Sequence, residues 1–172
     1  MPLETLERFA KSFDDVFALY PKELQLGFLK LLRGTSLRKD YQKYGYQFQQ
    51  EAPYELISSD YLSKQDIADI HLAEDMLQKY WNSGRMPITM NKVLRRQISP
   101  FYFFLDLGKY YQKYHFKFFK FQLDELFSYL DQYLKHEYQD DLIEDYLRLA
   151  KVKPKKWWQT RIKDEKEIKH QL

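Results

Sequence analysis

The stretch Leu24-Gln-Leu-Gly-Phe-Leu-Lys-Leu-Leu-Arg-Gly-Thr35 decides the fold that this sequence predicts. Its first part alternates apolar residues with polar or small ones, which is typical of a strand with one covered face, and residues 29–32 are apolar toward both faces. Gly34 permits the positive φ of a tight turn, and Ser36 can cap a helix over Leu37–Tyr44. The sequence therefore predicts a strand over residues 24–32, then a turn and a helix, which is one βα step of a parallel sheet.

The predicted strand lacks neighbours upstream. An amphipathic helix over Pro2–Phe17 precedes it directly after Met1, and no strand comes before that helix. Because a strand that is apolar on both faces requires neighbouring strands and covering helices, we expect the chain to be a piece of a larger α/β protein. We also expect strand 24–32 to pair with a local hairpin or with another copy of the chain, since its backbone groups are otherwise exposed.

Downstream of Gly45, which can end a helix in the left-handed conformation, the sequence predicts few strands and many helices. Two short segments rich in Tyr, Phe and Ile, residues 46–49 and 54–58, indicate a small hairpin. Caps, prolines and apolar periodicity then indicate helices over residues 63–82, 88–97, 100–111, 123–138 and 140–152. The predicted fold class is mainly α (α+β): a helical bundle with an N-terminal helix–strand–helix unit and a small β-hairpin.

Two side-chain features refine the predicted helices. Ser63 and Asp66 have the spacing of a capping box at the start of the helix over 63–82. Gly108 lies inside the helix that begins after Ser99, where a residue without a side chain allows a close helix crossing.

The composition excludes several classes of site. The chain has 172 residues, of which 44% are hydrophobic and 31% charged, as is typical of a soluble globular protein. It contains no cysteine, which excludes disulfides, thiolate zinc sites, a Cys nucleophile and a cysteine-ligated iron–sulfur cluster within this chain. No signal peptide is visible, and no apolar run approaches the roughly 20 residues that a membrane span needs. We therefore expect a cytoplasmic protein that does not span a membrane.

No catalytic constellation is visible in the sequence. The four histidines are scattered, and the i, i+4 pair of His71 and Asp75 is more typical of a helix surface contact than of a metal site. The five glycines do not assemble into a phosphate-binding loop. We therefore predict no catalytic residue and no metal ligand in this chain.

The C-terminal segment carries the excess positive charge. The net charge of the whole chain is +3, and residues 151–172 contain eight Lys or Arg against three Asp or Glu. Within this segment, Lys155, Lys156, Trp157 and Trp158 combine cations with aromatic rings, as nucleic-acid platforms do. The same residues can instead fold back and anchor the chain end. We favour the anchor, take the four as candidate interaction residues, and do not expect nucleic acid as a partner.

Several segments resemble one known family. Residues 24–37, LQLGFLKLLRGTSL, resemble the last strand and turn of the radical S-adenosylmethionine (SAM) barrel in bacterial cobalamin-binding radical SAM proteins. Residues 6–19 resemble the barrel helix before that strand. Residues 52–63 and 80–85 resemble the uncharacterised helical domain that ends these proteins, and residues 154–158 resemble its closing segment. The resemblance covers nearly the whole chain, although none of these strings is a catalytic motif.

The resemblance implies a division of the chain and a set of cofactors. Residues 1–45 would be the last α/β unit of the barrel, 46–153 the helical C-terminal domain, and 154–172 a basic tail with a Trp-Trp anchor. The implied parent is an Fe–S oxidoreductase with a cobalamin domain and a barrel that binds S-adenosylmethionine and a [4Fe–4S] cluster through Cys-x3-Cys-x2-Cys. Since this chain has no cysteine, it departs from that pattern. The cofactors would belong to the parent, and the remainder of the barrel would be the partner of this chain.

The resemblance also suggests candidate site residues by position. Groups at the C-terminal end of a barrel strand face the active site, so Lys30, Arg33, Gly34 and Thr35 are candidates near the active site of the parent. We therefore expect a catalytically silent C-terminal region on the substrate side of a cobalamin-dependent radical SAM protein, with its substrate unknown. The alternative is a stand-alone helical interaction module that binds protein or nucleic acid, and phosphate contacts would make the latter binding salt-dependent.

Overall fold

A computed structural model describes residues 3–150 of the chain. These residues form two compact units, and each is described by itself. The first contains residues 3–82 and 97–108, and the second contains residues 83–96 and 109–150. One long helix, α5, contributes residues to both units because the boundary falls inside it.

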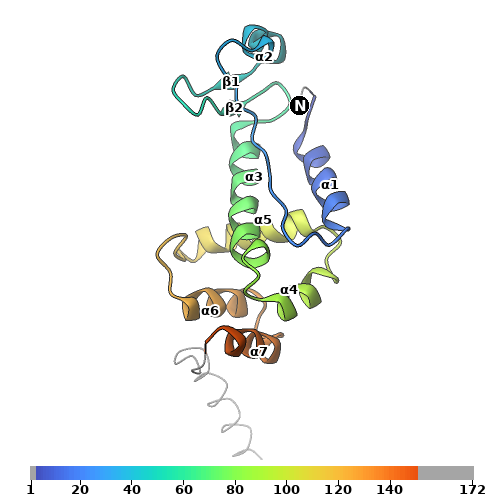
Figure 1. Ribbon diagram of the computed structural model, residues 1–172, viewed down its shortest axis with the longest axis vertical. Coiled ribbons are helices and arrows are strands. Elements are labelled where there is room, and N and C mark those ends of the chain that lie inside the picture. The colour runs from blue at the N-terminus through green and yellow to red at the C-terminus, as the bar shows by residue number, and fades with distance from the viewer. Residues whose placement is uncertain (1–2, 151–172) are drawn as a thin grey trace, which may run out of the picture. The chain divides into compact units, whose positions relative to one another are not determined.

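The described part of the chain is mainly helical, with one small antiparallel hairpin (Figure 1), which confirms the predicted fold class. The α-helices are α1 (Leu6–Phe17), α2 (Ser36–Lys39), α3 (Lys64–Leu77), α4 (Pro87–Leu94), α5 (Pro100–Lys113), α6 (Leu123–Tyr133) and α7 (Gln139–Leu149). A 3₁₀-helix η1 spans Tyr41–Tyr44, a π-helical turn η2 spans Gln78–Asn82, and the hairpin strands are β1 (Gln47–Phe48) and β2 (Leu56–Ser58). Among residues 3–150, no helix is long and apolar enough to cross a membrane.

The predicted strand over residues 24–32 is wrong as a strand. Residues 24–29 have no regular secondary structure, and only Lys30 makes a single antiparallel bridge, to Glu55. The reason is the lack of a partner of sufficient length, since β2 is three residues long. The remainder of the segment runs in an extended form alongside α3 (Figure 1), where side chains of α3 and η2 bind it.

The pairing expected for this segment is confirmed over its last residues. The backbone N–H of Leu31 donates to the carbonyl of Tyr54 at 2.9 Å, and the N–H of Leu56 donates to the carbonyl of Leu29 at 2.9 Å. Leu31 is fully buried there with Tyr46, Phe48 and Leu56, in a small core beneath the hairpin. The segment thus pairs with the local hairpin of its own chain, which was one of the two expected solutions.

The helix predicted over Leu37–Tyr44 is divided in the structure. Thr35, and not Ser36, is the N-cap of α2, because its side chain accepts a hydrogen bond from the N–H of Arg38. Asp40 leaves helical geometry and the chain continues as the tighter helix η1. Gly45 ends η1 in the left-handed conformation, with φ of 59°, as the sequence predicts.

Aromatic rings fill the interior of the first unit. The rings of Phe13 and Phe101 meet edge to face at 5.6 Å between centroids, and Phe17 lies 4.8 Å from Trp81. The start of α5 is tied to α1 as well, since the carboxylate of Asp14 accepts a hydrogen bond from the N–H of Phe101 at 2.8 Å. These contacts hold α1, the beginning of α5 and η2 together through residues far apart in sequence.

Two of the side-chain features predicted for the helices are confirmed in this unit. The capping box of Ser63 and Asp66 is complete at the start of α3. At Gly108, a Cβ atom would lie 2.4 Å from Cγ of Leu72, so α5 and α3 cross closely at this position. The predicted helix over 63–82 is also present, although its last turn widens into η2.

The second unit contains α4, α6, α7 and the end of α5. Tyr111 is fully buried and its ring lies 5.4 Å from the ring of Tyr129 on α6, while Phe127 packs against Tyr146 on α7 at 5.1 Å. The helix predicted over 123–138 stops earlier than expected, at Tyr133. The chain leaves it through Lys135 and His136, which both have left-handed φ values of 51° and 65°.

Candidate functional site

The loop of residues 30–35 contains all the candidate site residues that the structure describes. Lys30 and Arg33 are exposed, and Gly34 has a φ of +84° with open space beside its Cα. Thr35 stabilises the turn, because its hydroxyl donates to the carbonyl of Leu32 at 2.8 Å. The loop is therefore a defined turn that presents Arg33 to solvent next to an open backbone.

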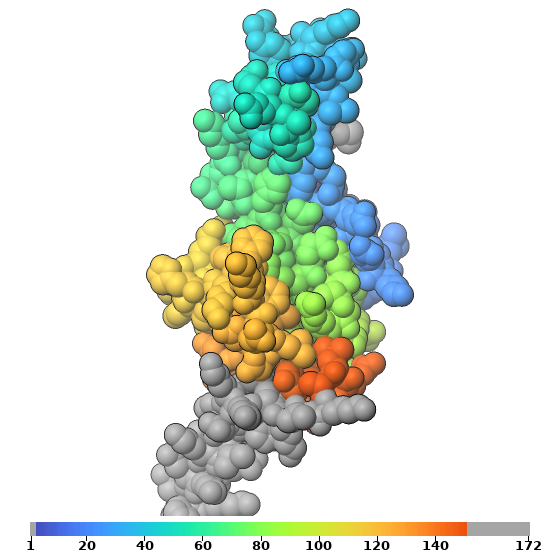
Figure 2. All heavy atoms as spheres, turned by 60° about the vertical axis from the view of Figure 1, so that its left-hand side comes forward, coloured from blue at the N-terminus to red at the C-terminus, as the bar shows by residue number. Residues whose placement is uncertain are grey.

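Tyr54 brings two arginines together beside this loop. The guanidinium carbon of Arg33 lies 5.5 Å from the centroid of the Tyr54 ring, and that of Arg38 lies 4.7 Å from it. Arg38 also lies over the ring of Phe48 at 4.9 Å, and its Nη1 donates to the carbonyl of Leu31 at 2.9 Å. We call Arg33, Arg38, Phe48 and Tyr54 the arginine–tyrosine cluster. In Figure 2, the light-blue loop and α2 lie against the cyan hairpin that carries Tyr54.

The charge of this cluster is not neutralised within the described part of the chain. Neither Arg33 nor Arg38 has a carboxylate within ion-pair distance among residues 3–150. The nearby carboxylate of Glu55 is directed to His71 instead, at 2.7 Å from its Nε2. Two guanidinium groups over one tyrosine ring, with no carboxylate partner among residues 3–150, can bind an anion from solution.

A histidine on α3 joins the extended segment to the hairpin. The ring of His71 stacks on Phe28 at 3.8 Å with an angle of 6° between the planes. Its Nε2 faces Glu55, and its Nδ1 lies 3.9 Å from Glu74. Burial raises the pKa of Glu74, and the neighbouring His71 opposes that shift. The contact suggested by sequence, His71 with Asp75, is not formed, because Asp75 pairs with Lys79 at 2.8 Å.

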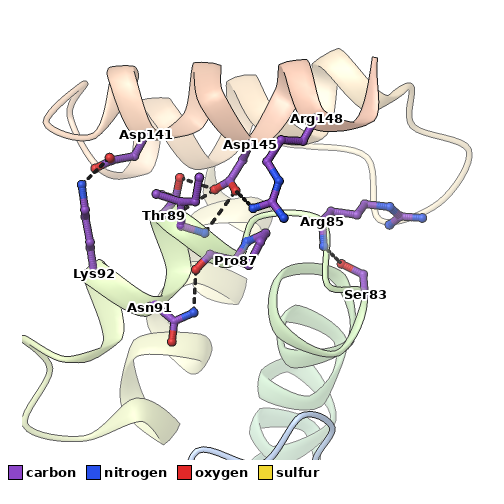
Figure 3. A network of polar contacts seen from close by, with 10 residues as sticks. Ser83, Arg85, Pro87, Thr89, Asn91, Lys92, Asp141, Asp145 and Arg148 are labelled. Carbon is purple, nitrogen blue, oxygen red and sulfur yellow. Dashed lines mark hydrogen bonds and ion pairs between the residues drawn. The ribbon is translucent and has the colours of Figure 1, made fainter. Parts of the chain in front are cut away.

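In the second unit, a fully buried carboxylate joins α7 to the start of α4 (Figure 3). Asp145 accepts hydrogen bonds from the backbone N–H of Ile88 at 3.1 Å, and from the N–H and hydroxyl of Thr89 at 2.8 Å and 2.9 Å. These are donors of the first turn of α4, which have no partner inside the helix. The carboxylate therefore acts as an N-cap supplied by another helix. These three hydrogen bonds are sufficient to account for the buried carboxylate, so we assign Asp145 a structural role.

A second buried carboxylate, Asp131, contacts a histidine after the end of α6. Its Oδ2 lies 2.8 Å from Nδ1 of His136 and accepts from Gln139 at 3.1 Å, while its Oδ1 has no hydrogen-bond partner. His136 borders a surface hollow of about 390 Å³ that Lys92, Tyr138 and Asp141 also line. The contact ties His136, which is in the left-handed conformation, back to the end of α6, so we assign the pair a structural role.

The remaining site predictions cannot be placed. Lys155, Lys156, Trp157 and Trp158 lie outside the described residues. Within residues 3–150, no group of three or more His, Asp or Glu side chains is arranged to hold a metal ion. The arginine–tyrosine cluster is therefore the candidate functional site of the described chain. Sequence reasoning identified Arg33 by its position but missed Arg38 and Tyr54, which only the fold brings together.

One family of proteins matches this chain over most of its length. The family, described as a protein of unknown function (DUF4080), matches residues 42–172. The chain belongs to this family. No curated protein and no solved structure matches the chain. The DUF4080 region begins just before Gly45, so it includes the hairpin with Tyr54 and excludes the loop of residues 30–35.

Proposed function

We propose that this chain is the C-terminal part of a bacterial, cytoplasmic cobalamin-dependent radical SAM protein. In this proposal, residues 1–45 belong to the end of the barrel and the DUF4080 region is an accessory domain on the substrate side. The observation that carries the proposal is the family match, which spans the region whose strings resemble the helical domain ending such proteins. The strings before residue 42 resemble the barrel, and they lie outside the match.

The cofactors of such a parent do not fit the residues of this chain. A [4Fe–4S] cluster needs thiolate ligands, and the chain has no cysteine. We therefore assign the cluster, S-adenosylmethionine and cobalamin to the preceding part of the parent, and we assign no step of the reaction to this chain. What the chain can contribute is shape and charge close to a bound substrate.

The loop of residues 30–35 supports a role on the substrate side. It is held by Thr35 and by the pairing of Leu31 with the hairpin, and it presents Arg33 to solvent. Because the hairpin belongs to the DUF4080 region, this loop is joined by backbone hydrogen bonds to the domain that follows it. The helical domain would thereby help to close the mouth of the barrel and to select the substrate.

The gene and its product in the source cell provide the first test. We expect intact mass and upstream sequence to reveal a longer protein with Cys-x3-Cys-x2-Cys ahead of residue 1. A native product that starts at Met1 would contradict the proposal and favour the stand-alone interaction module.

A second test uses the full-length parent. Removal of residues 46–172 should lower substrate turnover but leave reductive cleavage of S-adenosylmethionine measurable, since the cofactors are bound elsewhere. A parent carrying Arg33→Gln, which leaves the domain intact, separates an effect on substrate from a loss of folding. Unchanged substrate turnover in both variants would refute the substrate-side role.

A further inference from the structure

We propose that the arginine–tyrosine cluster is a binding site for a phosphate-bearing ligand. The site is formed by Arg33, Arg38 and Tyr54, with the open backbone at Gly34 beside them. It belongs to residues of this chain alone, so it does not depend on the identity of the parent protein.

The geometry fixes one guanidinium before any ligand binds. Arg38 is held by the carbonyl of Leu31 at 2.9 Å and by the rings of Phe48 and Tyr54 at 4.9 Å and 4.7 Å. One of its N–H groups is used in this way, and the other donors of the fork remain. Because the side chain is already ordered, binding an anion costs less conformational entropy than at a free surface arginine.

The second guanidinium supplies positive charge that no carboxylate among residues 3–150 neutralises. Arg33 is exposed and lies 5.5 Å from the Tyr54 ring, so both arginines face one aromatic side chain. Within residues 3–150 neither arginine forms an ion pair with a carboxylate. Two cations whose charge is not balanced by the described chain match a group with two negative charges better than one with a single charge.

The donors of the site suit the oxygens of a phosphate group. Arginine donates two parallel hydrogen bonds to phosphate oxygens, and two arginines can contact different oxygens of one phosphate or diphosphate. The turn at Gly34 has no atom within 4 Å of the position that a Cβ would occupy, so a ligand can approach the backbone there. Both guanidinium carbons lie within 5.5 Å of the centroid of the Tyr54 ring, so the two cations are close to this turn.

Calorimetric titration of the full 172-residue chain with inorganic pyrophosphate tests the proposal. We expect saturable one-to-one binding to the wild type, weakened by salt. We expect succinate, a dicarboxylate of similar charge separation, to bind at least about tenfold more weakly. Arg33→Gln and Arg38→Gln should each raise the dissociation constant by about fivefold or more, because each removes a charge-assisted contact.

Lys39→Gln is the matched control, since Lys39 is an exposed cation on the same short helix with the same change in charge. It should change the dissociation constant less than about twofold. Circular dichroism checks that each variant is folded, and Arg38→Lys, which keeps the charge but loses the planar fork, should also weaken binding. Absence of saturable binding, equal binding of succinate, or an equal loss in Lys39→Gln would each overturn the proposal.

Discussion

The carboxylate of Asp145 offers a sharp test of how the second unit is held together. Its side chain is inaccessible to solvent and accepts three hydrogen bonds from Ile88 and Thr89 (Figure 3). Arg148 lies 4.0 Å away and is mostly exposed, so this ion pair adds little to the stability that the three hydrogen bonds provide. The substitution Asp145→Asn keeps the size of the side chain but replaces one acceptor oxygen with a donor.

The expected cost follows from the donors that lose their acceptor. The amide oxygen of Asn can keep the two bonds to Thr89, and its NH₂ group then faces the N–H of Ile88 at the position of the former acceptor. A buried donor without an acceptor costs about 1–3 kcal/mol, and the two remaining bonds lose their charge assistance. We therefore expect Asp145→Asn to lower the free energy of unfolding by about 2–4 kcal/mol.

Urea denaturation followed by far-UV circular dichroism measures this loss, with Asp141→Asn as the control on the same helix. Asp141, whose side chain is 18% exposed, pairs with the mostly exposed Lys92, and loss of this ion pair should shift the midpoint less than loss of the buried cap. If Asp145→Asn shifted the midpoint no more than Asp141→Asn does, the assignment of Asp145 as the cap of α4 would be refuted.

Three further predictions concern the first unit. Gly108→Ala should destabilise the protein by about 1–3 kcal/mol, because the new Cβ would lie 2.4 Å from Cγ of Leu72. The control Gly27→Ala meets no atom within 4 Å and should have little effect. Equal shifts of the melting temperature in the two variants would argue against the close helix crossing. Asn82→Ala should lower the free energy of unfolding by about 1–2 kcal/mol, because the Asn82 side chain binds both the N–H and the carbonyl of Leu24. It should also speed hydrogen exchange at the amide of Leu24, whereas exposed Gln78→Ala is the control. Unchanged exchange in Asn82→Ala would contradict that contact. Burial raises the pKa of Glu74 above its usual 4.5, so the folded state binds this proton more tightly than the unfolded chain. The stability that this proton contributes is therefore fully present below pH 4.5, and it is lost as the pH rises through the raised pKa. Glu74→Gln should therefore gain stability relative to wild type between acidic and neutral pH in urea titrations, and a constant difference across that range would refute the burial effect.

Local signals in the sequence were sufficient for several elements. The capping box of Ser63 and Asp66, the left-handed Gly45 and the crossing at Gly108 all depend on residue types at one place in the chain, and the structure has each of them. The hairpin was also predictable, because its strands are short and adjacent in sequence. Signals between residues close together in the sequence were thus sufficient to predict most of the fold class.

Features that depend on distant partners were not predictable in this way. Alternation in residues 24–28 indicated a strand, but a strand exists only if a partner of matching length lies beside it, and α3 occupies that side instead. The same limit applies to the candidate site. Tyr54 is separated by sixteen or more residues from both arginines, and no periodic pattern links them.

The π-helical turn η2 has a consequence for how this sequence can change during evolution. A π turn holds one residue more than an α turn, so the last residues of η2 are rotated by about 100° from the positions that a regular continuation of α3 would give them. Trp81 donates to the carbonyl of Pro21 at 2.9 Å, and Asn82 binds Leu24, only at this rotation. Loss of one codon between Gln78 and Asn82 would restore a regular helix and turn both side chains away. We therefore expect the fold to tolerate a substitution at exposed Gln78 better than any change in the length of this stretch.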